Sequence, residues 1–345
     1  MRRADMSNKM SPKERVFSAL SGHEVDCIPV INSSTGINIT CMERSGAFFP
    51  EAYYSAPKIA ALAETGHTII GFDSITPYFS AHLEAISLGC EVQWGDAYHV
   101  PLITKRAFRN PEEFSPPDTF PNRPPCSALL KAIQMLKKKH GSTVPIIGKV
   151  IGPWSLAHFL YGIEDLLMDC ILEPQKIHTL LRQLNECAVK FAEAQFDAGA
   201  DIVTWIEHAS SDYFTPKVYQ DFLLPLHKNA TSRLGRHGPL IWTIFGDVAD
   251  RFELLAQSGF PVLNILPSND IPAARAVIGS RMTVIGTINN PDVLTGGSTM
   301  DVRRAVFHSI NSGSKIIAPE AAISTKTPTS NLIELVRAAH NYKYI

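Results

Sequence analysis

The chain has 345 residues, of which 45% are hydrophobic and 19% are charged, and its formal net charge is −1. This length and composition suffice for a large buried core, and the balanced charge excludes a basic field that would hold a nucleic-acid backbone or an anionic membrane. No apolar stretch reaches the roughly 20 residues that a membrane-spanning helix needs.

The N-terminus and the cysteines predict a cytoplasmic location. Arg2 and Arg3 are not followed by an apolar segment, so the N-terminus does not read as a secretory signal. The six cysteines are scattered and show no CxxC spacing. Such a pattern is typical of reduced thiols in a cytosol and not of a disulfide framework.

Short apolar runs alternate with longer amphipathic stretches along the chain. Runs that are rich in β-branched residues and bounded by Gly or Pro predict buried parallel strands. Eight such runs occur, at residues 27–31, 68–73, 145–151, 201–206, 240–244, 262–266, 282–286 and 315–318. The clearest helix is predicted at residues 180–198, where apolar residues recur at spacings of three and four and Gly199 marks the end.

Eight β-then-α units in series predict a parallel sheet, and eight is the number of strands that closes a barrel. We therefore expect an α/β fold of the (β/α)8 TIM-barrel class, with a doubly wound open sheet as the alternative. Residues 1–345 are expected to form a single domain, because no stretch has the composition of a linker.

An insertion at residues 76–144 is longer than a crossover needs. Within it, residues 90–94 and 100–104 predict a small strand pair around the Gly95-Asp96 turn. Residues 114–125 are rich in proline and predict an ordered loop.

The chemistry of such barrels lies at the carboxyl ends of the strands, so polar residues at those ends are the candidate site. Glu207 and His208 follow the fourth predicted strand. A carboxylate and an imidazole there can act as an acid/base pair or as metal ligands. The alternative is that one of them caps the next helix or pairs with a surface cation, and adjacent residues tend to point apart.

Glu320 follows the eighth predicted strand, which lies opposite the fourth in an eight-stranded barrel. The Glu207 and Glu320 carboxylates are therefore expected to converge over the mouth, where mutual repulsion raises one carboxyl pKa. Such a pair can donate a proton or, with a cation bound, provide two hard ligands. We predict that both are catalytic; two solvated, independent carboxylates are the alternative.

Other residues near the predicted strand ends are candidates for substrate binding. Asp73 can anchor a polar substrate group or accept hydrogen bonds from backbone amides in a turn. Asp247 can bind substrate or cap a helix expected at residues 248–257. The remaining candidates are Trp154, His208 and Asn264. Four further histidines lie on helical patterns and are predicted to be surface or core residues: His82, His158, His308 and His340.

A set of short motifs occurs in order along most of the chain. They include Pro12-Lys13-Glu14-Arg15-Val16, Gly71-Phe72-Asp73, Leu88-Gly89-Cys90, Ile151-Gly152-Pro153-Trp154, Ala198-Gly199-Ala200-Asp201 and Ile317-Ala318-Pro319. Their order and spacing resemble the methylcobamide:coenzyme M methyltransferases, which share their fold with uroporphyrinogen decarboxylase. The resemblance implies the same barrel, corrinoid-linked methyl transfer in one-carbon metabolism, and a partner protein that supplies the methyl-corrinoid.

The resemblance also implies a zinc ion, held by a His-x-Cys pair at the end of the fifth strand and by a further Cys after the eighth. Zinc lowers the pKa of a bound thiol, and the thiolate then attacks a methyl group on cobalt. In this chain those positions are Thr243, Phe245 and Ala321, none of which ligates zinc in the usual way. No bound cofactor is therefore expected, although a divalent metal held by Glu207, His208 or Glu320 is an open alternative.

The decarboxylase branch of the superfamily carries an arginine-rich segment near the first strand, because its substrate has many carboxylates. Residues 31–36 of this chain contain no arginine, and the branch's aspartate and histidine align with Ser74 and Ala321. A corrinoid-dependent methyltransferase with a different site is therefore predicted. The alternatives are a decarboxylase-family enzyme acting on another small acid, an inactive barrel that binds a corrinoid-protein partner, and uroporphyrinogen decarboxylase itself.

Overall fold

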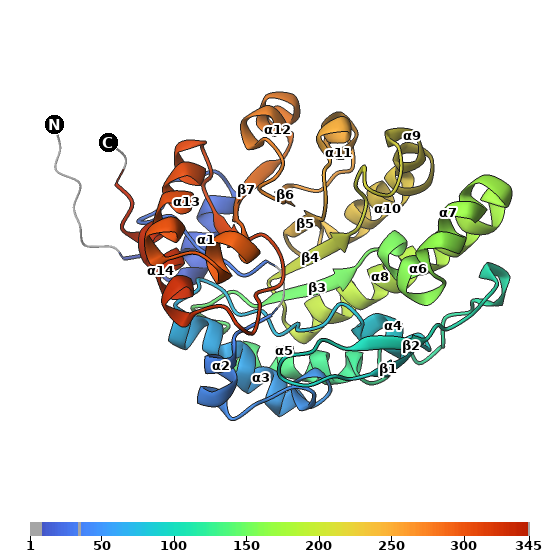
Figure 1. The fold of residues 1–345 in the computed structure, drawn as a ribbon, viewed down its shortest axis with the longest axis horizontal. Coiled ribbons are helices and arrows are strands. Elements are labelled where there is room, and N and C mark those ends of the chain that lie inside the picture. Colours follow the sequence, from blue (N-terminus) through green and yellow to red (C-terminus); the bar gives the residue numbers. More distant parts are fainter. Residues whose placement is uncertain (1–8, 34–35, 344–345) are drawn as a thin grey trace.

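A curled sheet of six parallel strands lies at the centre of the computed structural model, which describes residues 9–33 and 36–343 (Figure 1). The strands pair in chain order from β3 to β8. Their bounds are β3 (Ile147–Ile151), β4 (Ile202–Glu207), β5 (Leu240–Ile244), β6 (Val262–Ile265), β7 (Thr283–Ile288) and β8 (Ile317–Pro319).

Two short extended segments close this sheet between β8 and β3. Val30 forms a parallel bridge with Ile317 of β8, and Ile75 forms one with Ile146, just before β3. The N–H of Asp73 donates to the carbonyl of Val30 at 2.8 Å, so the two segments also join each other. The fold is therefore the predicted (β/α)8 barrel, and the open-sheet alternative is excluded because the sheet closes.

The second predicted strand is wrong in position. Gly66–Ile70 form a π-helical turn, Gly71 follows with a φ of 94°, and the extended segment begins only at Asp73. Periodicity alone does not separate a short apolar run in a strand from the apolar end of a helix. Asp73 consequently stands at the start of its strand and not at its end.

Helices surround the sheet (Figure 1). The predicted helix at residues 180–198 is the second part of a longer helix, which ends before Gly199 with its φ of 110°. The helices are α1 (Pro12–Leu20), α2 (Ile39–Ser45), α3 (Ala56–Thr65), α4 (Leu83–Ser87), α5 (Cys126–His140), α6 (Pro153–Leu160), α7 (Ile163–Leu172), α8 (Pro174–Ala198), α9 (Pro216–Val218), α10 (Leu224–Leu234), α11 (Phe252–Ala256), α12 (Ile271–Ile278), α13 (Thr299–Asn311) and α14 (Thr329–His340). Among the described residues, no helix is both long and apolar enough to cross a membrane.

The predicted strand pair of the insertion is present. β1 (Glu91–Gln93) and β2 (Leu102–Lys105) pair antiparallel on the outside of the barrel. Residues 114–125 form turns and loop, as predicted, and lead into α5.

The interior of the barrel changes from apolar to polar along the strands. The interior layer nearest the amino ends of the strands contains Ile147, Ile202, Ile241, Val262, Ile285 and Ala318. Val16 and Ala19 of α1 pack against this layer. Side chains two positions further along a strand point into the same interior. On β3 to β7 these are Lys149, Thr204, Thr243, Asn264 and Thr287, each at most 5% exposed. We call these five residues the polar layer.

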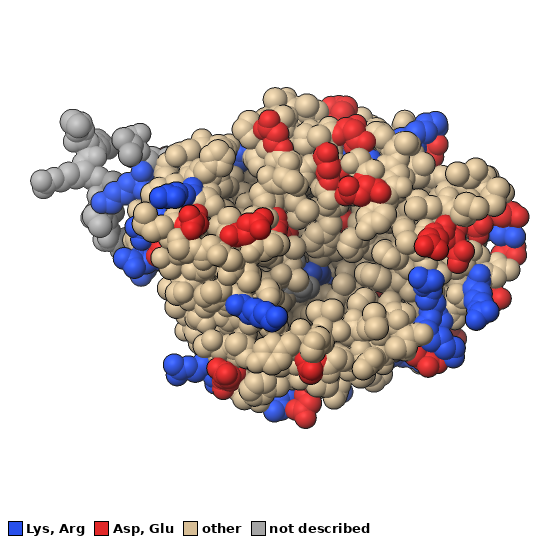
Figure 2. All heavy atoms as spheres, in the orientation of Figure 1, with Lys and Arg blue, Asp and Glu red and all other residues tan. Residues whose placement is uncertain are grey.

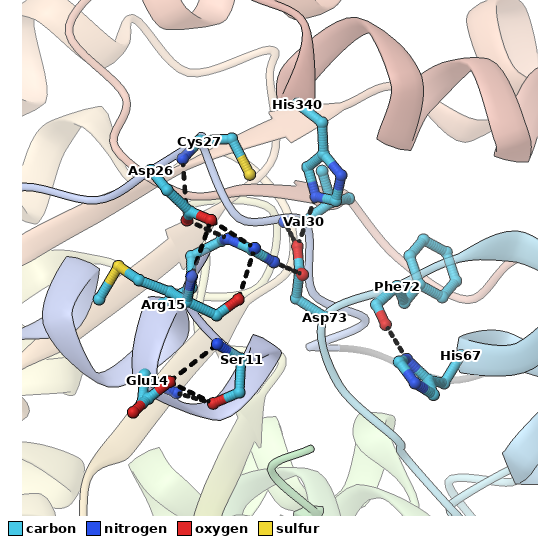
Figure 3. A network of polar contacts seen from close by, with 11 residues as sticks. Ser11, Glu14, Arg15, Asp26, Cys27, Val30, His67, Phe72, Asp73 and His340 are labelled. Atoms are coloured by element: carbon cyan, nitrogen blue, oxygen red, sulfur yellow. Dashed lines mark hydrogen bonds and ion pairs between the residues drawn. The ribbon is translucent and has the colours of Figure 1, made fainter. Parts of the chain in front are cut away.

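A buried ion-pair network holds the amino end of the barrel together (Figure 3). The Asp73 carboxylate accepts hydrogen bonds from Nη1 of Arg15 at 2.5 Å and from the N–H of Val30 at 2.8 Å. It also lies 2.8 Å from Nε2 of His340 at the end of α14, and Asp26 binds the other side of the Arg15 guanidinium. One carboxylate thus connects α1, both short strand segments and the last helix.

Replacing Asp73 by asparagine should lower the free energy of unfolding by about 3 kcal/mol, because it leaves a buried guanidinium without one of its counter-ions. Urea denaturation followed by circular dichroism measures this loss. The matched control is Asp221→Asn, which breaks an exposed pair with Lys217 and should cost under about 1 kcal/mol. Equal losses in the two variants would contradict a stabilising role for the network.

Candidate functional site

Glu207 ends β4 and points away from the barrel interior, because Ile202 and Thr204 occupy the inward positions of this strand. The Glu207 side chain is fully buried. Its carboxylate accepts hydrogen bonds from the backbone N–H groups of Trp154 at 3.3 Å and Ser155 at 3.0 Å, and from the Ser155 hydroxyl at 2.8 Å. Glu207 therefore caps the start of α6, where the helix dipole favours a negative charge.

The Gly-Pro-Trp-Ser motif makes this contact possible. A Cβ atom at Gly152 would lie 2.1 Å from Oε1 of Glu207 and 2.4 Å from Nε1 of Trp205, so a larger residue would displace the carboxylate. Pro153 begins the helix at a position where its missing N–H costs nothing. Ser155 then supplies both a backbone and a side-chain donor.

His208 follows Glu207 and points to the opposite side, toward the barrel mouth. Its backbone N–H donates to Oγ of Ser155 at 2.8 Å, and its Nδ1 lies 3.0 Å from the same oxygen. Because the Ser155 hydroxyl already donates to Glu207, it accepts a hydrogen bond from Nδ1–H of His208. This network assigns the proton to Nδ1 and leaves Nε2 of His208 as an acceptor.

Burial keeps the imidazoles at the mouth uncharged. It is the largest cause of a His208 pKa lowered to about 4, and the nearby His158, Lys149 and His82 add to the effect. Burial also lowers the pKa values of His82 and His158. The ring centres of His158 and His208 are 6.3 Å apart, and Phe245 stacks on His208 at 5.1 Å. At neutral pH the mouth therefore presents neutral rings.

Lys149 of the polar layer belongs to a second buried group. Its Nζ atom lies 5.2 Å from the centre of the Tyr78 ring. The Tyr78 hydroxyl donates to Glu84, which also accepts a hydrogen bond from the N–H of Ile151 at 2.9 Å. Burial lowers the pKa of Lys149 well below its ordinary value, and burial raises the pKa of Glu84 to about 7.

Glu320 lies at the mouth end of β8. Its Oε1 accepts hydrogen bonds from the N–H of Asn290 at 2.8 Å and from Nδ2 of Asn289 at 3.1 Å, at the start of the π-helical turn η7 (Asn290–Thr295). Burial raises the pKa of this carboxyl group. Within the described residues no contact joins Glu207 and Glu320, and each carboxylate is held at a different helix start.

The remaining candidate residues are dispersed. Trp154 is buried with its ring edge-on to Phe214 at 4.4 Å. Asp247 is exposed and accepts a hydrogen bond from the N–H of Ala249 at 2.9 Å, whereas the residue at the N-cap of the following helical turn, η5 (Ala249–Arg251), is Val248. Asn264 donates to Oγ of Ser33 at 2.5 Å across the barrel interior. Asp73 lies at the opposite, amino end of the barrel.

Several residues at the mouth were not identified as candidates from the sequence. Lys149 had a usable signal, because it is the one charged residue in the apolar run at residues 145–151. His82 and His158 had none, since they belong to separate helical segments and only the fold brings them near His208. Ser155 is likewise recognisable only from its contacts with Glu207 and His208.

The positions implied to bind zinc do not offer zinc donors. Thr243 is buried in the polar layer, the Phe245 ring packs on His208, and Ala321 has no donor atom. In the part of the chain that the structure describes, no group of three or more His, Cys, Asp or Glu side chains is arranged to hold a metal ion.

Replacing Ser155 by alanine should change the tautomer of His208, because the acceptor for Nδ1–H is lost. Nitrogen NMR of the ¹⁵N-histidine-labelled protein measures this change, with Ser232→Ala as a control, because the exposed Ser232 hydroxyl donates to the Asn229 carbonyl on the outside of α10. In the unsubstituted protein the His208 signals should stay constant from pH 8 to about pH 5.5, well above the pKa of about 4. A midpoint near pH 6.5 would contradict the buried, neutral ring.

The sequence matches the uroporphyrinogen decarboxylase (URO-D) family model over residues 11–342. It is 29% identical over 337 residues to a methylcobamide:CoM methyltransferase of Methanosarcina acetivorans, which covers 97% of this chain and 99% of that protein. It is also 27% identical to a uroporphyrinogen decarboxylase of Coxiella burnetii, over 63% of each chain.

The similarity extends to solved structures. A methyltransferase from Methanosarcina mazei superposes with a TM-score of 0.91 at 25% identity, over 96% of this chain and 98% of that one. The two methyltransferase comparisons and the family match each span almost the full length of the chain. The chain therefore belongs to the uroporphyrinogen decarboxylase family.

Proposed function

We propose that this chain is a corrinoid-linked methyltransferase whose substrate binds at the His208 side of the mouth and whose chemistry does not use a zinc-bound thiolate. The observation that carries the proposal is the near-complete overlap with methylcobamide:CoM methyltransferases in sequence and with a methyltransferase in structure. By analogy with those relatives, a separate corrinoid protein supplies the methyl-corrinoid.

The side chains at the implied zinc positions support the second half of the proposal. A catalytic zinc ion of this kind is held by an imidazole and thiolates. The side chains of Thr243, Phe245 and Ala321 offer a hydroxyl, a phenyl ring and a methyl group instead, which cannot replace those ligands. The Phe245 ring also occupies one face of His208. Activation of a thiol on zinc at this place would need donors that the chain lacks there.

The mouth residues fit a role in orienting a substrate. A histidine with a pKa of about 4 is a weak base at neutral pH, but its Nε2 is a good acceptor for an N–H or O–H of the substrate. Ser155 and Glu207 act as positioning residues, because they fix the ring and its tautomer. Glu320, whose carboxyl pKa is raised by burial, is the proposed proton donor at the other side of the mouth.

The purified protein should not transfer a methyl group from methylcobalamin to coenzyme M, with or without added zinc. The visible spectrum of methylcobalamin reports the reaction. The matched variant restores the donors by Thr243→His, Phe245→Cys and Ala321→Cys, and it should bind about one zinc ion more than the unsubstituted protein, since three ligands suffice for a catalytic zinc site.

Two outcomes would contradict the proposal. Zinc-dependent methylation of coenzyme M by the unsubstituted protein would mean that zinc binds elsewhere or through other residues. Conversion of uroporphyrinogen to coproporphyrinogen at an ordinary enzymatic rate would assign the chain to the decarboxylase branch, although residues 31–36, of which 34–35 lie outside the described part, contain no arginine for a polyanion.

A further inference from the structure

Lys149 is the charged member of the polar layer. On the neighbouring position of β3, a Cβ atom at Gly148 would lie 2.5 Å from the Gln195 side chain of α8, so Gly148 faces the helices and Lys149 faces the interior. Lys149 is 2% exposed, and no carboxylate among the described residues forms an ion pair with its ammonium group. Figure 2 shows a hollow near the centre of the molecule with lysine or arginine atoms at its bottom.

Three other residues of the polar layer have hydrogen-bonding atoms without a partner among the described residues. Oγ1 of Thr204, Oγ1 of Thr243 and Oδ1 of Asn264 are buried and find no partner among the described residues. Thr204 pairs in register with Lys149 across β3 and β4, and Thr243 pairs with Asn264 across β5 and β6. Buried polar atoms are normally hydrogen-bonded, so an arc of such atoms over four adjacent strands indicates a missing partner.

The charges around this arc favour an anion as that partner. The rings of His208, His82 and His158 above it are neutral at physiological pH. Glu84 is the acid that acts on Lys149, but its oxygens are engaged by Tyr78 and the N–H of Ile151, and burial raises its pKa to about 7. Burial lowers the pKa of Lys149 well below its ordinary value, so an anion bound beside Nζ would supply a counter-charge that favours the protonated ammonium group.

We infer that the polar layer binds the anionic head group of a small acid, a carboxylate or a sulfonate, with Lys149 as its cation and the hydroxyl groups of Thr204 and Thr243 as donors. Hydrogen bonds from a charged donor to a charged acceptor are the strong ones, and hydroxyl donors complete the coordination of the remaining oxygens. The rest of the acid would extend toward Nε2 of His208.

A small acid bound in this way would be the substrate of the proposed methyl transfer, so its role as a substrate rests on that proposal. Binding of an anion needs neither corrinoid nor turnover. Failure of anion binding and failure of methyl transfer are therefore separate results.

Isothermal titration calorimetry on the full chain tests the inference with two probes, propionate and ethanesulfonate, and with their neutral amides as controls. The unsubstituted protein should bind at least one of the two anions saturably and neither amide, and the stronger anion identifies the head group. Lys149→Met should weaken the binding at least tenfold. Lys139→Met, at an exposed lysine paired with Glu64, should leave it unchanged.

Thermal unfolding separates lost binding from lost folding. Lys149→Met replaces a buried cation by an apolar side chain of similar length, so the variant should melt at the same temperature or higher. Absence of saturable binding of both anions would mean that only water completes the arc, and it would overturn the inference. Undiminished binding in Lys149→Met, or equal binding of the amides, would overturn it as well.

Discussion

The buried carboxylate of Glu207 fixes the arrangement of the mouth. It is fully buried and is satisfied by the first N–H groups of α6 and by the Ser155 hydroxyl. Leaving such a group without its partners would cost about 1–3 kcal/mol or more, since it is charged. The same contact requires Gly152 and orients Ser155, which in turn places the proton on Nδ1 of His208. The acceptor Nε2 at the mouth therefore depends on a carboxylate that points away from the barrel interior.

The same physical solution recurs around the barrel. Glu320 after β8 accepts the N–H of Asn290 after β7, and Oδ1 of Asn269 after β6 accepts the N–H of Val248 after β5 at 2.9 Å. In each case the polar side chain follows one strand. It accepts a hydrogen bond from a backbone N–H that follows the strand before it in the chain. These polar residues at strand ends therefore stabilise the fold by accepting backbone hydrogen bonds. Side chains that point into the barrel are the ones left to contact a ligand.

The sequence was sufficient for the fold but only partly for the site. Runs of β-branched residues correctly predicted the positions of β3 to β8. The apolar run at residues 68–70 instead belongs to the end of a helix, so Asp73 was predicted at the end of its strand although it stands at the start. Adjacent residues point apart, so one of Glu207 and His208 had to face inward, but the pattern alone did not say which. The approach of His82 and His158 to His208 depends on tertiary packing, and no local spacing encodes it.

The central claim is methyl transfer at His208 without a zinc-bound thiolate. The most direct measurement follows the visible spectrum of methylcobalamin with the purified protein and a panel of small carboxylic and sulfonic acids that carry an amine, hydroxyl or thioether group. We predict demethylation with at least one of these acids, unaffected by a zinc chelator and lost in His208→Ala. A requirement for zinc, or undiminished demethylation by His208→Ala, would contradict methyl transfer at His208 without a zinc-bound thiolate. Absence of demethylation with every acid of the panel would contradict it as well.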